Sequence, residues 1–179
     1  MSPAFVLTLL ATGFFLVSLL FLSTRKPGYS HLRHTISELG EVGAPDQRLV
    51  AFGMFLPIGV LLLVAAFLMR SNEPRSLLAL CIGVGYVVAA FFPCDPGSPV
   101  TGTTRQSVHN LGGAVEYIGG AFALWKISEY LGQPFQIAAF IVGAAAILLS
   151  VPETGAVRGL IQRLAEACLF GGLVWSAAA

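Results

Sequence analysis

The sequence predicts an all-α membrane bundle of six transmembrane helices, with a short interfacial helix after the first. Of the 179 residues, 56% are hydrophobic and only 11% are charged, whereas soluble domains carry about 25% charged residues. Six apolar runs come close to the roughly 20 residues that cross a hydrocarbon core of about 30 Å. They leave no room for a separate soluble domain, so we expect residues 1–179 to form a single integral membrane domain.

The predicted spans follow one another with short connections. They cover residues 3–23, 49–69, 76–92, 108–124, 136–151 and 157–179. Arg25 and Lys26 end the first span, and Pro27-Gly28 breaks its helix. Pro57 lies inside the second span and predicts a kink there, which membrane helices tolerate.

The predicted interfacial helix covers residues 30–40. Ser30 is a suitable N-cap and Gly40 a typical C-terminal glycine. His31, His34 and Glu38 would share one face of this helix, with apolar residues on another. We therefore expect it to lie at the membrane surface.

Counting the crossings places the connections after spans one, three and five on one face of the membrane. Both termini and the two short connections lie on the other face. All three histidines, His31, His34 and His109, belong to the first face together with Asp95 and Arg105. This clustering predicts a polar pocket at that face.

Basic residues indicate the orientation in the membrane. Seven lie near the polar face and three near the other, so the positive-inside bias favours polar loops in the cytoplasm and termini outside. The net charge of +1, without a block of like charges, gives no indication of nucleic-acid binding. Three cysteines, two of them in spans, do not suggest a disulfide framework.

Several motifs are spread along the chain: Pro27-Gly28-Tyr29-Ser30, Leu32-Arg33-His34-Thr35-Ile36-Ser37-Glu38-Leu39-Gly40, Phe92-Pro93, Asp95-Pro96 and His109. Together they resemble the prokaryotic six-span membrane family known as domain of unknown function nine-nine-eight, and the resemblance covers essentially the whole chain. More loosely, the chain resembles the DRAM-like six-span proteins. The resemblance implies a six-span fold in the prokaryotic cytoplasmic membrane and supplies no established activity. The chain departs from the family pattern at His31, a position where proline is frequent in the family.

A zinc site is one hypothesis for the polar face. His31, His34 and His109 could supply three nitrogen ligands, with Asp95, Cys94 or Glu116 as a fourth. Zinc takes such ligands at about 2.0–2.3 Å and would activate water for hydrolysis. The alternative is that these histidines pair with nearby carboxylates at the interface without any metal.

A headgroup site is a second hypothesis. Arg33 and Arg105 would hold an anion near the start of span four, because arginine binds phosphate in a bidentate manner and helix starts favour anions. Ser37, Glu38 and Asn110 complete the expected ligand-binding set. The alternative is ordinary interfacial arginines that contact bulk lipid or neighbouring carboxylates.

Glu116 is the most informative single residue. It lies two turns beyond His109 on the same face of span four, roughly 10 Å below the interface. An intramembrane carboxylate is costly unless it is paired or hydrated, so it is a candidate proton carrier, base or anchor for a basic ligand. Its alternative role is a packing bond to Arg163 or Tyr86. Glu166, in contrast, is expected to be neutralised locally by Arg163.

These patterns predict a membrane protein that binds or modifies a lipid headgroup or small amphiphile. Its expected catalytic set is His34, Asp95, His109 and Glu116. If it is an enzyme, hydrolysis or group transfer at the membrane surface is the expected class, with zinc as a candidate cofactor. The alternatives are a small proton-coupled transporter that uses Glu116, and a structural or assembly protein without a catalytic site.

Overall fold

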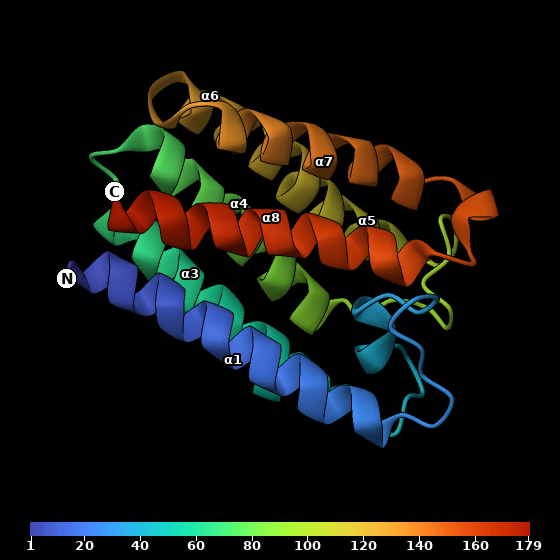
Figure 1. Cartoon of the computed structure of the whole chain (residues 1–179). Coiled ribbons are helices and arrows are strands. Elements are labelled where there is room, and N and C mark those ends of the chain that lie inside the picture. The colour runs from blue at the N-terminus through green and yellow to red at the C-terminus, as the bar shows by residue number, and fades with distance from the viewer.

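The computed structural model describes all 179 residues and contains helices but no strands. Six helical rods build the molecule, as Figure 1 shows. They are α1 (Pro3–Arg25), α2–η2–α3 (Gln47–Val50, Ala51–Phe55 and Leu56–Leu68), α4 (Glu73–Phe91), α5–η3–α6 (Thr104–Ala114, Val115–Gly119 and Gly120–Leu131), α7 (Gln133–Leu149) and α8 (Arg158–Ala178). Two short 3-10 helices, η1 (Ser37–Gly40) and η4 (Pro152–Thr154), lie in the connections. The predicted all-α bundle is confirmed.

Three of the rods are long and apolar enough to cross a membrane, judged by length and composition: α1, α2–η2–α3 and α4. The helix α7 is apolar but shorter. The other two rods carry charged residues within their length, Glu116 in α5–η3–α6 and Glu166 in α8 among them. Both of these carboxyl groups are buried in the bundle, so their place is the protein interior rather than the lipid.

The first rod shows how the sequence forms a membrane helix. The Ser2 hydroxyl caps α1 by accepting a hydrogen bond from the Phe5 N–H, 3.1 Å away, and Pro3 occupies the first turn, where its missing N–H is harmless. One face of α1 is buried against α3 and α8, with Ala11, Phe15 and other residues at three- and four-residue spacing. Most of its remaining apolar residues are exposed, among them Leu10, Val17 and Leu20, as expected for a helix in contact with lipid.

Two rods contain a π-helical turn. The turn η2 precedes Pro57, which has no N–H and whose ring crowds the carbonyl one turn earlier, so the backbone widens there. The second turn, η3, contains Glu116 and Tyr117. Because π-helical turns are frequent at functional sites, η3 makes this part of the fourth rod a candidate functional region.

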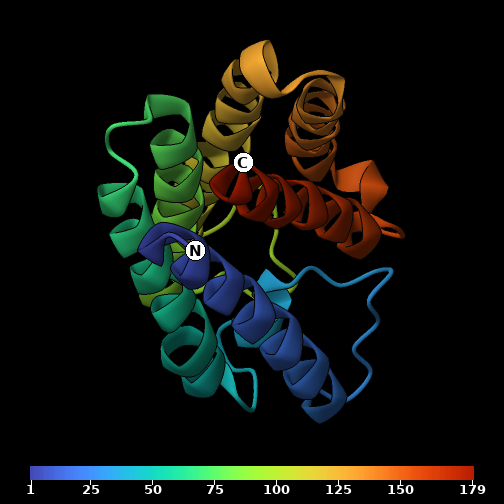
Figure 2. The same cartoon turned by 60° about the vertical axis from the view of Figure 1, so that its left-hand side comes forward.

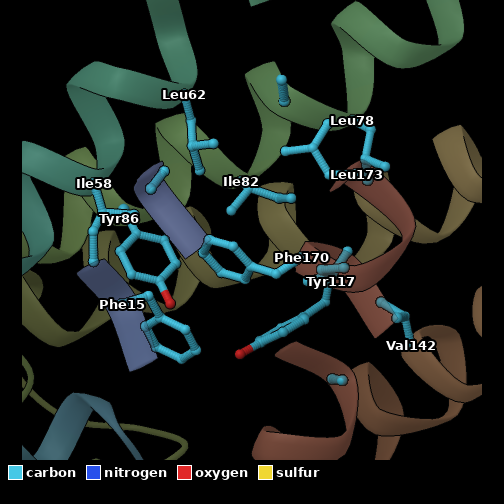
Figure 3. Close-up of a cluster of buried hydrophobic side chains, with 14 of the residues drawn as sticks. Phe15, Ile58, Leu62, Leu78, Ile82, Tyr86, Tyr117, Val142, Phe170 and Leu173 are labelled. Carbon is cyan, nitrogen blue, oxygen red and sulfur yellow. The ribbon is translucent and has the colours of Figure 1, made fainter. Parts of the chain in front are cut away.

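The helix α4 lies at the centre of the bundle and packs against α3, α5, α6 and α8. A Cβ atom on Gly59 would lie 2.9 Å from the carbonyl oxygen of Gly83, so α3 and α4 touch through their backbones. Figure 3 shows the apolar core around α4, including Leu78, Ile82 and Leu173, which are completely buried. The same core reaches the loop-containing end of the bundle through Ile36, Leu39 and Val50.

Both termini lie at one end of the bundle, and the connections 26–46, 92–103 and 150–157 lie at the other (Figure 1). We call this second end the loop face. Its connections bond to one another: the Val42 N–H donates to the Cys94 carbonyl at 3.0 Å, and the Gly97 N–H donates to the Glu41 carboxylate at 2.7 Å. The first two connections are therefore joined directly, and all three lie at the same end of the bundle.

The predicted helix over residues 30–40 is wrong, because only Ser37–Gly40 forms a short 3-10 helix. Side chains compete for the backbone groups here. The Ser30 N–H donates to His34 Nδ1 at 2.9 Å, and the Thr35 N–H donates to Glu38 Oε1 at 2.8 Å. The segment also bonds to α8, since the Leu160 N–H donates to the Leu32 carbonyl at 3.0 Å. Figure 2 shows this blue segment passing close to the start of the red α8.

Candidate functional site

One cavity of about 500 Å³ lies in the loop-face half of the bundle. Four of the predicted site residues line it: Ser37, His109, Asn110 and Glu116. The other predicted residues lie outside its lining, namely His31, Arg33, His34, Glu38, Asp95 and Arg105. The structure therefore brings part of the predicted site together.

The cavity has two chemically different walls. The polar wall includes Ser37, His109, Asn110, Glu116, Arg158 and Gln162. The apolar wall includes Leu111, Ile118, Ala146 and Leu149, and serines such as Ser107 and Ser150 also line the cavity. Leu111 and Ile118 lie on the exposed outer surface of their helices, and α7 packs along α6 and η3 but contacts α5 little. The cavity thus extends from the bundle interior to its outer surface between α5 and α7.

Glu116 forms the inner end of this cavity. Its side chain is 6% exposed, and its Oε1 atom is buried without any hydrogen-bond partner. The opposite helix allows this position because Gly85 of α4 has no side chain; a Cβ atom there would collide with the Glu116 carboxylate. The side chains of Glu116 and Glu166 line the same small space inside the bundle.

Glu166 is held by two tyrosines from other rods. The Tyr117 hydroxyl donates to Glu166 Oε1 at 2.7 Å, and the Tyr86 hydroxyl donates to Oε2 at 3.2 Å. Figure 3 shows the hydroxyl ends of these tyrosines directed toward the same space. Gln162 extends the network, because its Nε2 donates to the Tyr117 hydroxyl at 3.1 Å and its Oε1 accepts from the Ile36 N–H at 2.5 Å.

The predicted neutralisation of Glu166 by Arg163 is wrong. The Arg163 guanidinium points to the segment after α1, where it donates to the Tyr29 hydroxyl at 2.6 Å and to the His34 carbonyl at 3.0 Å. No salt bridge joins Arg163 to Glu166. Glu166, Tyr117 and Gln162 are therefore site residues that sequence reasoning missed. The available signal was the four-residue spacing of Arg158, Gln162 and Glu166, which places them on one stripe of α8.

His109 and Asn110 are held in place by backbone carbonyls. His109 Nδ1 lies 2.9 Å from the Phe92 carbonyl oxygen, and that partner requires the proton on Nδ1. Asn110 Nδ2 donates to the Val100 carbonyl at 2.8 Å, while its Oδ1 accepts from Gln106 at 2.8 Å. Both side chains join α5 to the preceding connection and present their remaining surface to the cavity.

Asp95 and Arg105 bond to each other in the connection before α5. Asp95 Oδ2 accepts from the Thr103 N–H at 2.8 Å, and its Oδ1 accepts from the Thr103 hydroxyl at 2.9 Å and from Arg105 at 2.5 Å. The Thr103 N–H and, after it, Arg105 hold the pKa of Asp95 below its usual value. This ion pair fixes the shape of the connection, so Arg105 is already neutralised and turned away from the cavity.

His31 and His34 lie with Tyr29 and Arg163 on another side of the loop face. Arg163 donates to His31 Nδ1 at 3.0 Å, and burial together with Arg163 lowers the pKa of His31. Burial raises the pKa of Tyr29 to about 12. Glu38 accepts hydrogen bonds from Thr35, and Arg33 is exposed. These residues connect the first connection to α8.

The structure does not assemble the hypothetical zinc ligands. No group of three or more His, Cys, Asp or Glu side chains is placed so that it could hold a metal ion. His109 and Asp95 bond to different backbone partners, and His31 and His34 lie with Arg163. Cys94 donates to the Ser37 carbonyl at 3.4 Å, and burial raises its pKa to about 12, so its thiol stays protonated.

Arg158 is the basic residue that the cavity does contain. Its Nη1 donates to the Gly97 carbonyl at 3.3 Å, whereas its Nε is buried without a partner. It lies at the start of α8, at the loop-face end of the cavity. The sequence prediction assigned anion binding to Arg33 and Arg105 and did not include Arg158.

The fold and the cavity define the class of this protein as an all-helical membrane bundle with a partly polar interior site. Comparison with protein families gives a match over residues 9–179 to the family described as Protein of unknown function (DUF998). The chain therefore belongs to the DUF998 family, as its motifs suggested. Neither the search of curated proteins nor the search of solved structures gives a match.

Proposed function

We propose that this integral membrane protein binds an amphiphile, such as a membrane lipid, in the cavity between α5, α7 and α8. The mixed lining of the cavity carries this proposal: the polar side chains of Glu116 and Gln162 are buried in the bundle, and the apolar side chains of Leu111 and Ile118 reach its outer surface. A headgroup would lie against the polar wall, and a hydrocarbon chain would leave between α5 and α7. The volume of about 500 Å³ lies within the range of about 300–1,000 Å³ of ligand pockets.

Arg158 is the candidate contact for an anionic group of this ligand. Its buried Nε lacks a partner, and its side chain lines the cavity. A guanidinium binds phosphate or carboxylate oxygens through charge-assisted hydrogen bonds. Arg105 is less suitable, because it already pairs with Asp95.

The structure supports ligand binding better than it supports catalysis by the predicted catalytic residues. Asp95 and His34 are engaged in hydrogen bonds within the connections, and His109 bonds to the Phe92 carbonyl. Hydrolysis or group transfer would need a nucleophile beside a base, or a metal-bound water. Neither arrangement is formed by His34, Asp95 and His109, so we propose a binding function for the cavity.

Proton-coupled transport through Glu116 is a second candidate function. The unpartnered Oε1 of Glu116 at the inner end of the cavity favours it. Against it stands the completely buried core between this carboxyl group and the terminal end of the bundle, which includes Leu78, Ile82 and Leu173. Transport would require these helices to separate, whereas binding does not.

The proposal predicts that filling the apolar wall displaces the ligand. Ala146→Trp adds an indole to the wall formed by α7, and we expect lipid retained after purification in mild detergent to fall about tenfold. Native mass spectrometry measures the fraction of protein that carries lipid.

Ala144→Trp provides the matched control, because Ala144 lies on the outside of the same helix. We expect it to retain lipid like the natural sequence. If Ala146→Trp also retains as much lipid as the natural sequence, this result contradicts the proposed binding site. If both variants lose lipid, the ligand is held at the outer surface of α7 instead of in the cavity.

A further inference from the structure

The Glu116–Glu166 pair is the largest concentration of buried acidic groups in the bundle. The two side chains are 6% and 3% exposed, and neither takes part in a salt bridge. Their neighbours are uncharged: Tyr86 and Cys81 of α4, Tyr117 of η3 and Gln162 of α8. The nearest basic residue, Arg163, directs its hydrogen bonds to the segment after α1.

Two adjacent buried carboxylates cannot both keep an uncompensated negative charge. Burial and mutual repulsion oppose the second charge, so a shared proton or a bound cation must neutralise part of the pair. The tyrosines satisfy both oxygens of Glu166, whereas Oε1 of Glu116 has no partner. The Glu116 side chain also lines the larger cavity.

A second, smaller cavity lies beside the two carboxyl groups. It has a volume of about 30 Å³ and is lined by Ile36, Phe55, Tyr86, Glu116, Gln162 and Glu166 among others. This space suits one or two groups of the size of water. A primary ammonium group has this size, donates three hydrogen bonds and is attracted to aromatic faces such as that of Tyr86.

We propose that the Glu116–Glu166 pair binds the primary ammonium group of an amphiphile held in the larger cavity, an inference that rests on the proposed function. The Glu116 carboxyl group, which lines both cavities, accepts a hydrogen bond from the ammonium group, and the pair supplies the compensating charge. Arg158 does not oppose this, because it lies eight residues from Glu166, about 12 Å along the helix. With an anionic group at Arg158, the ligand as a whole is zwitterionic.

Three single-chain amphiphiles of equal length test the proposal: dodecylamine, dodecyltrimethylammonium and dodecanol. Their binding to the full chain in phosphatidylcholine nanodiscs is measured by calorimetry against empty nanodiscs. We expect dodecylamine to bind about tenfold more tightly than the other two. The trimethylammonium headgroup carries the same charge but is too large for the smaller cavity. It therefore distinguishes binding that depends on headgroup size from simple charge attraction.

The variants Glu116→Gln and Glu129→Gln complete the experiment. Glu129 is exposed and pairs with Lys126, so its replacement serves as the matched control. We expect Glu116→Gln to bind the three amphiphiles equally, and Glu129→Gln to keep the preference for the amine. The comparison within the natural sequence does not depend on how well either variant folds.

The outcomes separate this inference from the proposed function. Equal binding of the three amphiphiles by the natural sequence, or an unchanged preference in Glu116→Gln, overturns the ammonium site and leaves the cavity as a binding site. If sodium ions displace dodecylamine from the natural sequence but not from Glu116→Gln, the pair binds an inorganic cation. That result also overturns the ammonium site. If no amphiphile binds and Ala146→Trp leaves lipid retention unchanged, the proposed function fails as well.

Discussion

Asp95 holds the connection between α4 and α5 in shape through bonds to Thr103 and Arg105. Asp95→Asn keeps the size of the side chain but removes the charge that both partners recognise. We therefore expect a melting temperature a few degrees lower, measured by the unfolding of the protein in detergent. Asp46→Asn is the control, because its partner Arg25 is exposed and such surface pairs contribute little.

The same residue predicts a dependence on pH. Because the pKa of Asp95 is lowered in the folded protein, its charge stabilises the fold above the usual value of 3.8. This stabilisation disappears as the pH falls through the lower folded value. The melting temperatures of the natural sequence and Asp95→Asn should therefore converge below about pH 4. A constant difference down to the most acidic measurable pH would contradict the proposed role of the charge.

At the scale of helices, Gly85 allows α4 to approach η3 closely enough for Glu116 to be buried. Gly85→Ala would place a Cβ atom 2.7 Å from the Cβ of Glu116, so one of the helices must shift. Overpacking of this kind costs about 1–3 kcal/mol, which we expect to measure as lower stability. Gly171→Ala is the control, since no atom lies within 4 Å of the added carbon. Equal stability of the two variants would show that α4 and η3 separate without cost.

Helices were predictable from the sequence because the apolar runs are long and are interrupted by proline, glycine and arginine. The segment 30–40 was not, because its side chains bond to their own backbone and to α8, which the helical spacing alone does not reveal. The site was predictable in part. Glu116 was found because an intramembrane carboxylate is costly, whereas Glu166 was missed because Arg163, three residues away, turns toward Tyr29.

At the scale of the whole molecule, both ends of the bundle carry charged residues, but the cavity and the carboxyl pair lie in the loop-face half. Completely buried leucines such as Leu78 and Leu173 occupy the half near the termini. Under the proposed function, a ligand would enter from the loop face or from the lipid between α5 and α7. Which membrane face supplies it depends on the orientation of the chain.

The distribution of basic residues predicts this orientation. Three of the seven at the loop face pair with carboxylates: Arg25 with Asp46, Lys26 with Glu41 and Arg105 with Asp95. The positive-inside bias counts basic residues and not net charge. We therefore expect the loop face in the cytoplasm. Alkaline phosphatase fused after Ala179 should be active in a bacterial host, and green fluorescent protein fused there should be dark.

Fusions after Glu153 provide the matched control, because η4 lies at the opposite end of the bundle. There the fluorescent protein should fold in the cytoplasm and the phosphatase should be inactive. A reversed pattern at both positions would place the loop face outside, so that the cavity would take its ligand from the outer leaflet. The same reporter active at both positions would contradict the bundle itself, because α8 joins the loop face to the terminal end.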